Sequence, residues 1–164
     1  MDFLASLEQS RFFIWVRESG SLFAFPTILL LHTYGMAVLV GVVAVLDLRI
    51  LGFAPALPLK PLERFLPILW VAFWINAVTG TILLLADATT KLTNVDFLVK
   101  MLFIALGVIV QRTLEKRVFR PERVSDRTVP AGARMLAVAS LICWLGAITA
   151  GRLLAYVGPV SGLE

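Results

Sequence analysis

The stretch at residues 22–46, LFAFPTILLLHTYGMAVLVGVVAVL, decides the class of fold. Its only readily ionised side chain is His32. A helix needs roughly 20 mainly apolar residues to cross a hydrocarbon layer about 30 Å thick. The stretch has this length and very little charge. It therefore predicts a transmembrane helix.

Three further stretches predict helices of the same kind: residues 65–86, 95–114 and 133–157. Lys100 lies near the start of the third stretch, where a long side chain can reach the membrane surface. The predicted fold class is therefore all-α. We expect an integral membrane bundle of four transmembrane helices that forms a single domain over residues 1–164.

The composition fits a chain that lipid surrounds. Hydrophobic residues make up 59% of the sequence and charged residues 16%, against about 45–50% and about 25% in soluble domains. The net charge of +4 could indicate nucleic acid, but the basic residues gather in one loop. We therefore expect the lipid bilayer as a partner, and no nucleic acid. The single cysteine excludes an intrachain disulfide.

The basic residues also predict the orientation in the membrane. Seven of the fifteen Lys and Arg residues lie in the loop 112–134. Four spans would place ten basic residues on the side of this loop and five on the other. Positively charged loops stay in the cytoplasm, where this one could also bind anionic lipid headgroups. The sequence therefore predicts a multi-pass protein of the bacterial inner membrane with both termini in the periplasm.

Residues 2–18 predict a short helix on the outer membrane surface. Phe12, Phe13 and Trp15 suit the headgroup region, where aromatic rings collect. The segment carries several charges and lacks an uninterrupted apolar core. It is therefore not expected to be a cleavable signal peptide.

Small residues recur at every fourth position of the last predicted span and indicate a packing face. They are Ala139, Cys143, Ala147, Gly151 and Ala155. Another helix could approach closely along this stripe, within the chain or in an intermolecular contact. Ala37 and Gly41 form a shorter pair of the same type in the first span.

His32 is the main candidate for chemistry, because an ionisable group inside the membrane is costly unless it has a partner. Its imidazole could ligate haem iron, bond to a quinone or relay a proton. A structural histidine bonded to another helix is the alternative. Because His32 is the only histidine, a sixth haem ligand would have to be Met101, Met135 or His32 of a second copy. No other metal site is predicted.

Further polar residues lie at comparable depth and extend the predicted ligand-binding set to His32, Tyr34, Asn76, Thr79, Lys100 and Arg152. Such a set could bind an anion or the head of a quinone or lipid. Hydrogen bonds and ion pairs between helices are the alternative explanation, and the more expected one. Nearer the opposite surface, Asp47 is expected to form an ion pair with Arg64 or Arg112.

The segments HTYGMAVLVGVVAVLDLRILG (32–52), NAVTGTILLLAD (76–87) and FLVK (97–100) resemble a family of small bacterial four-helix membrane proteins of unknown function. The resemblance covers about residues 12–115. It implies that the family's motif positions are His32, Asp47, Arg49, Thr79, Gly80 and Lys100. It implies no activity. Small membrane cytochromes are similar in layout, but they carry several histidines.

The sequence contains none of the nucleotide-binding, metalloprotease or hydrolase motifs, and no catalytic residue is predicted. An independent enzyme is therefore less expected than a non-catalytic subunit of a larger membrane complex, such as one that transfers electrons. Such a subunit would contact other membrane proteins or a second copy of itself. A haem- or quinone-binding electron carrier that uses His32 is the first alternative. A small transporter or channel is the second.

Overall fold

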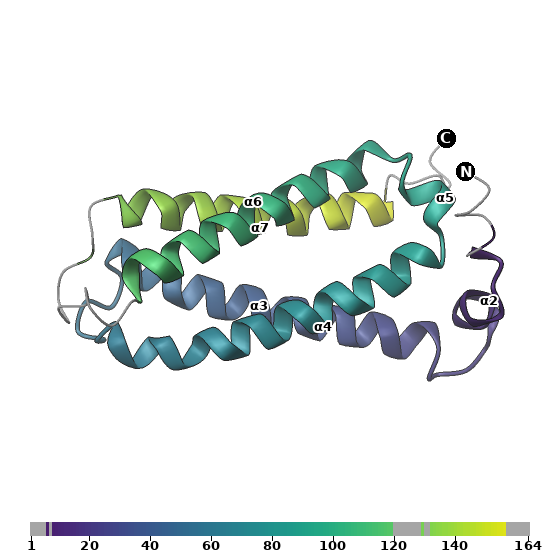
Figure 1. Cartoon of the computed structure of the whole chain (residues 1–164), viewed down its shortest axis with the longest axis horizontal. Helices are drawn as coiled ribbons and strands as arrows, with labels where there is room; N and C mark the ends of the chain where they lie inside the picture. Colours follow the sequence, from purple (N-terminus) through teal and green to yellow (C-terminus); the bar gives the residue numbers. More distant parts are fainter. Residues whose placement is uncertain (1–5, 7, 120–128, 130–131, 157–164) are drawn as a thin grey trace. The chain divides into compact units, whose positions relative to one another are not determined.

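The computed structural model describes residue 6, residues 8–119, residue 129 and residues 132–156. Its elements are the helices α2 (Arg11–Glu18), α3 (Phe25–Leu51), η1 (Lys60–Phe65), α4 (Leu66–Leu85), α5 (Ala88–Lys91), α6 (Val95–Val118) and α7 (Ala133–Tyr156) (Figure 1). No strand occurs in these described parts of the chain.

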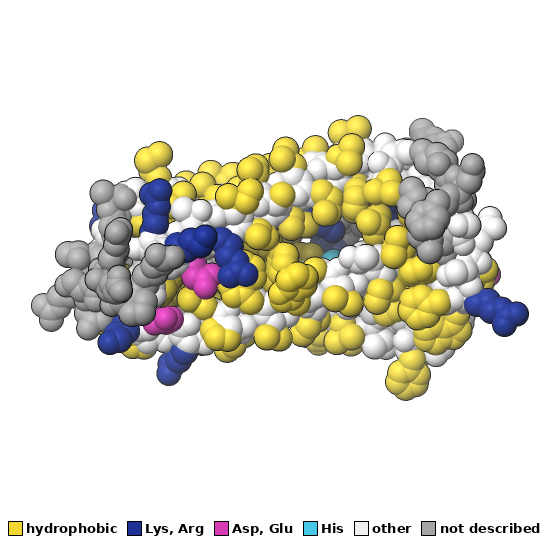
Figure 2. All heavy atoms as spheres, in the orientation of Figure 1, with side chains coloured by type: hydrophobic (Ala, Val, Ile, Leu, Met, Phe, Trp, Pro, Cys, Tyr) yellow, Lys and Arg dark blue, Asp and Glu magenta, His cyan; other side chains and the backbone are white. Residues whose placement is uncertain are grey.

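Four helical segments are long and apolar enough to cross a membrane: Phe25–Leu51, Lys60–Leu85, Val95–Val118 and Ala133–Leu154. The predicted all-α class, with four membrane-spanning helices and a short N-terminal helix, is therefore confirmed. The chain is a multi-pass membrane protein. Hydrophobic side chains cover most of the visible helix surface (Figure 2), as expected where lipid replaces water.

The helices differ from the predicted spans mainly at their ends. The first helix begins at Phe25 rather than residue 22, and it continues to Leu51 rather than ending at residue 46. Leu46 and Ile50 on its last turns are each 1% exposed, so packing extends the helix beyond the purely apolar run. Between Ser6 and Arg11, a turn at Gln9 and Ser10 interrupts the single helix predicted over residues 2–18.

The chain forms two compact units. The first unit comprises Met1–Leu39 and Leu69–Asn94, and the second comprises Val40–Ile68 and Val95–Glu164. The first unit therefore contains α2, the first half of α3, most of α4, and α5. The second contains the rest of α3, η1, the start of α4, α6 and α7.

In the first unit, two charged side chains hold the N-terminal segment to the end of α4. The Arg17 guanidinium donates a hydrogen bond to the carbonyl of Ala86 (3.3 Å) and forms an ion pair with Glu8 (3.5 Å). Glu8 in turn accepts a hydrogen bond from the hydroxyl of Thr89 (2.9 Å). A cation near the carbonyls at a helix C-terminus is favourable. The N-terminal segment is thus tied to α4 and α5 by polar contacts.

In the second unit, α6 and α7 lie side by side (Figure 1) and fit aromatic rings onto glycines. A Cβ atom at Gly107 of α6 would lie 3.2 Å from the Trp144 ring of α7. A Cβ atom at Gly146 of α7 would lie 2.8 Å from the Phe103 ring of α6. Each helix therefore supplies one ring and one glycine. Such close van der Waals contact is the main source of helix association in lipid.

The second unit also fixes the chain where it leaves α3. Arg49, 8% exposed, donates hydrogen bonds from its guanidinium to the carbonyls of Leu57 and Pro55. Gly52 adopts a φ of 105° in the turn that follows α3, a conformation that glycine adopts without steric cost. The hydrogen bonds of Arg49 thus hold the loop between α3 and η1 against the end of α3.

Candidate functional site

The imidazole of His32 is held in the first unit between α3 and α4. Its Nδ1 lies 3.1 Å from the carbonyl oxygen of Asn76 and 3.1 Å from the hydroxyl oxygen of Thr79. A carbonyl oxygen can only accept a hydrogen bond, so Nδ1 must carry the proton. The Thr79 hydroxyl donates to the carbonyl of Ile75 (2.7 Å), which leaves its lone pair for Nδ1–H. In the neutral ring, Nε2 therefore carries the lone pair.

Two glycines allow α3 and α4 to approach closely around this histidine. A Cβ atom at Gly80 would lie 2.9 Å from Cε1 and 3.3 Å from Nδ1 of His32, so the ring occupies the space of the missing side chain. Gly35, one turn after His32, lies against the backbone of α4, where a Cβ atom would be 3.3 Å from the carbonyl oxygen of Ala72. The position of the imidazole thus depends on both helices having no side chain at these points.

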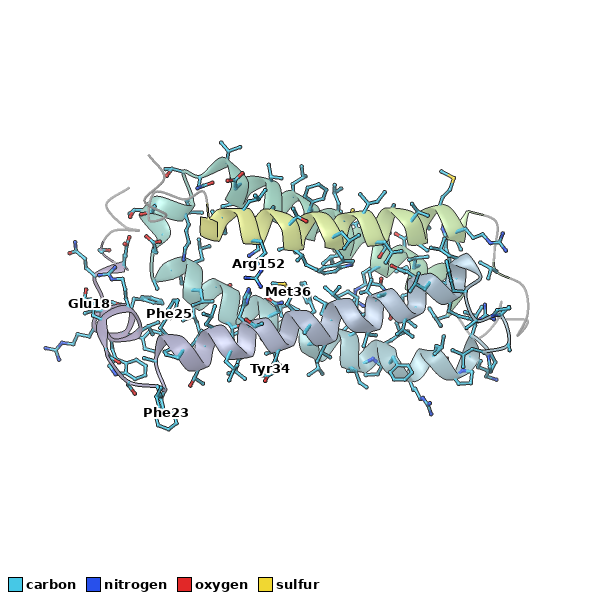
Figure 3. All side chains as sticks on the ribbon, turned by 180° about the vertical axis from the view of Figure 1, so that it is seen from behind. Glu18, Phe23, Phe25, Tyr34, Met36 and Arg152 are labelled. Carbon is cyan, nitrogen blue, oxygen red and sulfur yellow. The ribbon has the colours of Figure 1, made fainter. Side chains whose placement is uncertain are left out.

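The structure brings together three of the six predicted ligand-binding residues. His32, Asn76 and Thr79 meet in the first unit, with Asn76 contributing its backbone carbonyl. Tyr34 does not join them, since it is 62% exposed and projects outward from α3 (Figure 3). Two residues turn a helix by about 200°, so Tyr34 cannot share the face of His32.

The other two predicted residues, Lys100 and Arg152, belong to the second unit. The side chain of Lys100 crosses α7 at Gly151, where a Cβ atom would lie 3.5 Å from Cε and 3.6 Å from Nζ of the lysine. Arg152, the next residue of α7, has an exposed side chain. Gly151 therefore makes room for a charged side chain as well as belonging to a stripe of small residues.

The predicted ion pair of Asp47 is wrong. Neither carboxylate oxygen of Asp47 has a hydrogen-bond partner in the described parts of the chain. Arg112 pairs instead with Glu115 on its own helix (3.4 Å), and the guanidinium of Arg64 lies 5.4 Å from the ring centre of Phe65. Neither arginine contacts the acid, which is buried with no cation beside it in the part of the chain that the structure describes.

The predicted packing stripe of α7 is only partly the face that packs within the chain. Cys143 and Ala147 are buried, whereas Ala139 and Gly151 are half-buried. The side chain of Ala155 lies outside the described residues. A residue outside the stripe, Gly146, also lies close to α6, since a Cβ atom there would be 2.8 Å from the Phe103 ring.

Sequence reasoning missed three buried polar residues of the second unit: Gln111, Ser140 and Trp144. Gln111 lies within the third predicted span, and the other two lie within the fourth. A polar atom inside an apolar run is itself a signal, because it needs a partner away from water. That signal could have identified them.

No family model, curated protein or solved structure matches the chain. The described residues contain no group of three or more His, Cys, Asp or Glu side chains that could hold a metal ion. The chemistry that the His32 site supports is therefore that of one oriented imidazole. Its Nδ1 is fixed by the carbonyl of Asn76 and the hydroxyl of Thr79.

Proposed function

We propose that this chain is a non-catalytic subunit of a larger membrane assembly, and that it contacts its partner through the outward face of α3. The observation that carries the proposal is the position of Tyr34. It is the tenth residue of α3 and lies about 15 Å along the helix, well inside the hydrocarbon layer. Its hydroxyl has no hydrogen bond within the described parts of the chain, and the residue is 62% exposed.

A tyrosine hydroxyl in lipid lacks the partner that buried tyrosines normally find. A neighbouring membrane protein would supply one. The same side of α3 carries the small pair Ala37 and Gly41, both exposed, and a Cβ atom at Gly41 would meet nothing within 4 Å. The described part of the chain thus leaves this face of α3 uncovered, and another helix could pack closely on it.

The charge bias supports a bacterial inner membrane location with both termini in the periplasm. In this orientation His32 and Tyr34 lie in the outer half of the bilayer, and the loop 112–134 lies in the cytoplasm. An assembly that handles electrons or quinones suits an imidazole at this depth.

Photo-crosslinking in the native membrane tests the proposal. We expect p-benzoylphenylalanine in place of Tyr34 to form an adduct with a protein, which mass spectrometry would identify as another subunit or a second copy. The matched control is the same replacement at Val78, which is 57% exposed on α4 and expected to react with lipid. Adducts with lipid alone at both positions would remove the proposal.

A second candidate function is a haem- or quinone-binding electron carrier. The tautomer of His32, with the proton on Nδ1, favours it. Nδ1–H donates to a backbone carbonyl, as in histidines that ligate metals through the other nitrogen. Nε2 then has the lone pair to bind haem iron or to accept a hydrogen bond from a quinol hydroxyl. The single histidine makes the quinone the simpler ligand.

The substitution Gly80→Ala tests this candidate, because the new methyl group would displace the His32 ring. We expect gently extracted wild-type protein to carry quinone or a Soret band, and Gly80→Ala to lose it. Gly20→Ala, which fills open space and precedes α3, should retain the ligand. Wild-type protein with neither quinone nor pigment would exclude the carrier function and leave the subunit proposal standing.

A further inference from the structure

Four polar side chains are buried in the second unit, away from the His32 site. Asp47 and Ser140 are 0% exposed, Gln111 is 1% exposed and Trp144 is 5% exposed. They come from three helices, α3, α6 and α7. All four lie within membrane-spanning segments.

The contacts between α6 and α7 place Gln111 and Ser140 at one level, with Trp144 one turn away along α7. Gly107 of α6 lies against the Trp144 ring of α7. Gln111 is one turn after Gly107, and Ser140 is one turn before Trp144. Because the two helices run in opposite directions, Gln111 and Ser140 lie opposite each other. The Ser140 hydroxyl also lies beside the Asp47 carboxylate. The two groups are nevertheless not joined by a hydrogen bond of normal geometry.

Five polar atoms of this cluster have no hydrogen-bond partner in the described parts of the chain: both carboxylate oxygens of Asp47, Oε1 of Gln111, Oγ of Ser140 and Nε1 of Trp144. Native proteins rarely leave buried polar atoms unpaired, because each one loses its interaction with water. Four of the five are oxygens, and two of these four belong to the Asp47 carboxylate. Among the described residues, no positively charged side chain pairs with the Asp47 carboxylate.

We propose that this cluster binds a monovalent cation, with Asp47, Ser140 and Gln111 supplying the oxygen ligands. Oxygen atoms are the ligands that hard cations prefer. One carboxylate balances one positive charge, whereas a divalent ion would leave a net charge buried in the membrane. A water on the cation would accept the hydrogen bond of Trp144 Nε1. The inference is independent of the subunit function, since it concerns different residues.

Sodium is the probe for the test. We expect the purified full-length chain in detergent to bind radioactive Na⁺ saturably in a choline buffer. Asp47→Asn should abolish binding, and Ser140→Ala and Gln111→Ala should each weaken it by roughly tenfold or more. Glu115→Gln is the matched control, since it removes a carboxylate one turn from Gln111 on the same helix. It should bind as the wild type does.

Size-exclusion chromatography of each variant establishes that it is folded, and infrared spectroscopy of the wild-type protein supplies a second measurement. The infrared band of a protonated carboxylic acid, assigned by its loss in Asp47→Asn, should be absent from wild-type protein saturated with Na⁺. No saturable binding, or a band that persists in Na⁺, would show that Asp47 holds a proton instead and would overturn the proposal. Displacement of Na⁺ by an equal concentration of Mg²⁺ would overturn the assignment to a monovalent ion.

Discussion

Replacing Gly146 by leucine is expected to push α6 and α7 apart and to lower the free energy of unfolding by about 3 kcal/mol. Even a single Cβ atom at this position would lie 2.8–2.9 Å from three atoms of the Phe103 ring. That distance is shorter than non-bonded carbon atoms tolerate, and leucine adds three further carbons. Either the ring or the whole helix must move.

The large effect follows from the solvent. In water, a displaced apolar side chain still gains from leaving the aqueous phase. In lipid that gain is absent, and helices associate through van der Waals contact and polar bonds. A side chain that prevents close contact therefore removes most of the attraction between α6 and α7. The thermal unfolding midpoint in detergent measures the loss.

The pair Gly146→Ala and Phe103→Leu serves as the control for this explanation. Gly146→Ala alone should lower the midpoint, and Phe103→Leu in the same chain should restore part of it by making room for the methyl group. A double-mutant cycle isolates this coupling. If Gly146→Leu unfolds at the wild-type midpoint, the close contact between the two helices is not what holds them together.

The same contact shows what the sequence could and could not predict. Length and composition predicted four membrane-spanning helices. The thickness of the hydrocarbon layer sets the minimum number of consecutive apolar residues in a span, and this number can be counted in the sequence. The small residues of α7 predicted a packing face, and Cys143 and Ala147 are indeed buried. A close contact with α6 nevertheless also occurs at Gly146, outside that stripe. It depends on which side chain of α6 lies at the same level, which the pattern of one helix does not contain.

The candidate site was predictable to a similar extent. His32 and Thr79 could be grouped because both are polar and lie at similar depth in their spans. The outward direction of Tyr34 also follows from helical geometry, since it is two residues from His32. The partner of Arg49 did not follow. Its guanidinium bonds to loop carbonyls at Pro55 and Leu57, and the course of a loop is not fixed by hydrophobic periodicity.

Replacing Asp47 by leucine is expected to stabilise the protein in Na⁺-free buffer, by about 1–4 kcal/mol. Both carboxylate oxygens are buried and unpaired in the described parts of the chain, so this side chain opposes folding when no cation is bound. Leucine removes the unpaired group and leaves an apolar side chain in an apolar place. Most substitutions at a buried position destabilise a protein. A gain in stability for Asp47→Leu would therefore be strong support for the prediction.

Sodium should reverse the order of stability. A ligand that binds only the folded state raises stability with its concentration, so the wild-type midpoint should rise in Na⁺ while that of Asp47→Leu stays constant. Glu63→Leu, an exposed acid of η1, controls for the loss of a charge alone and should change stability by less than about 0.5 kcal/mol. If Asp47→Leu is equally destabilised with and without Na⁺, the carboxylate has a partner other than a cation. The buried cluster would then be a structural network rather than an ion site.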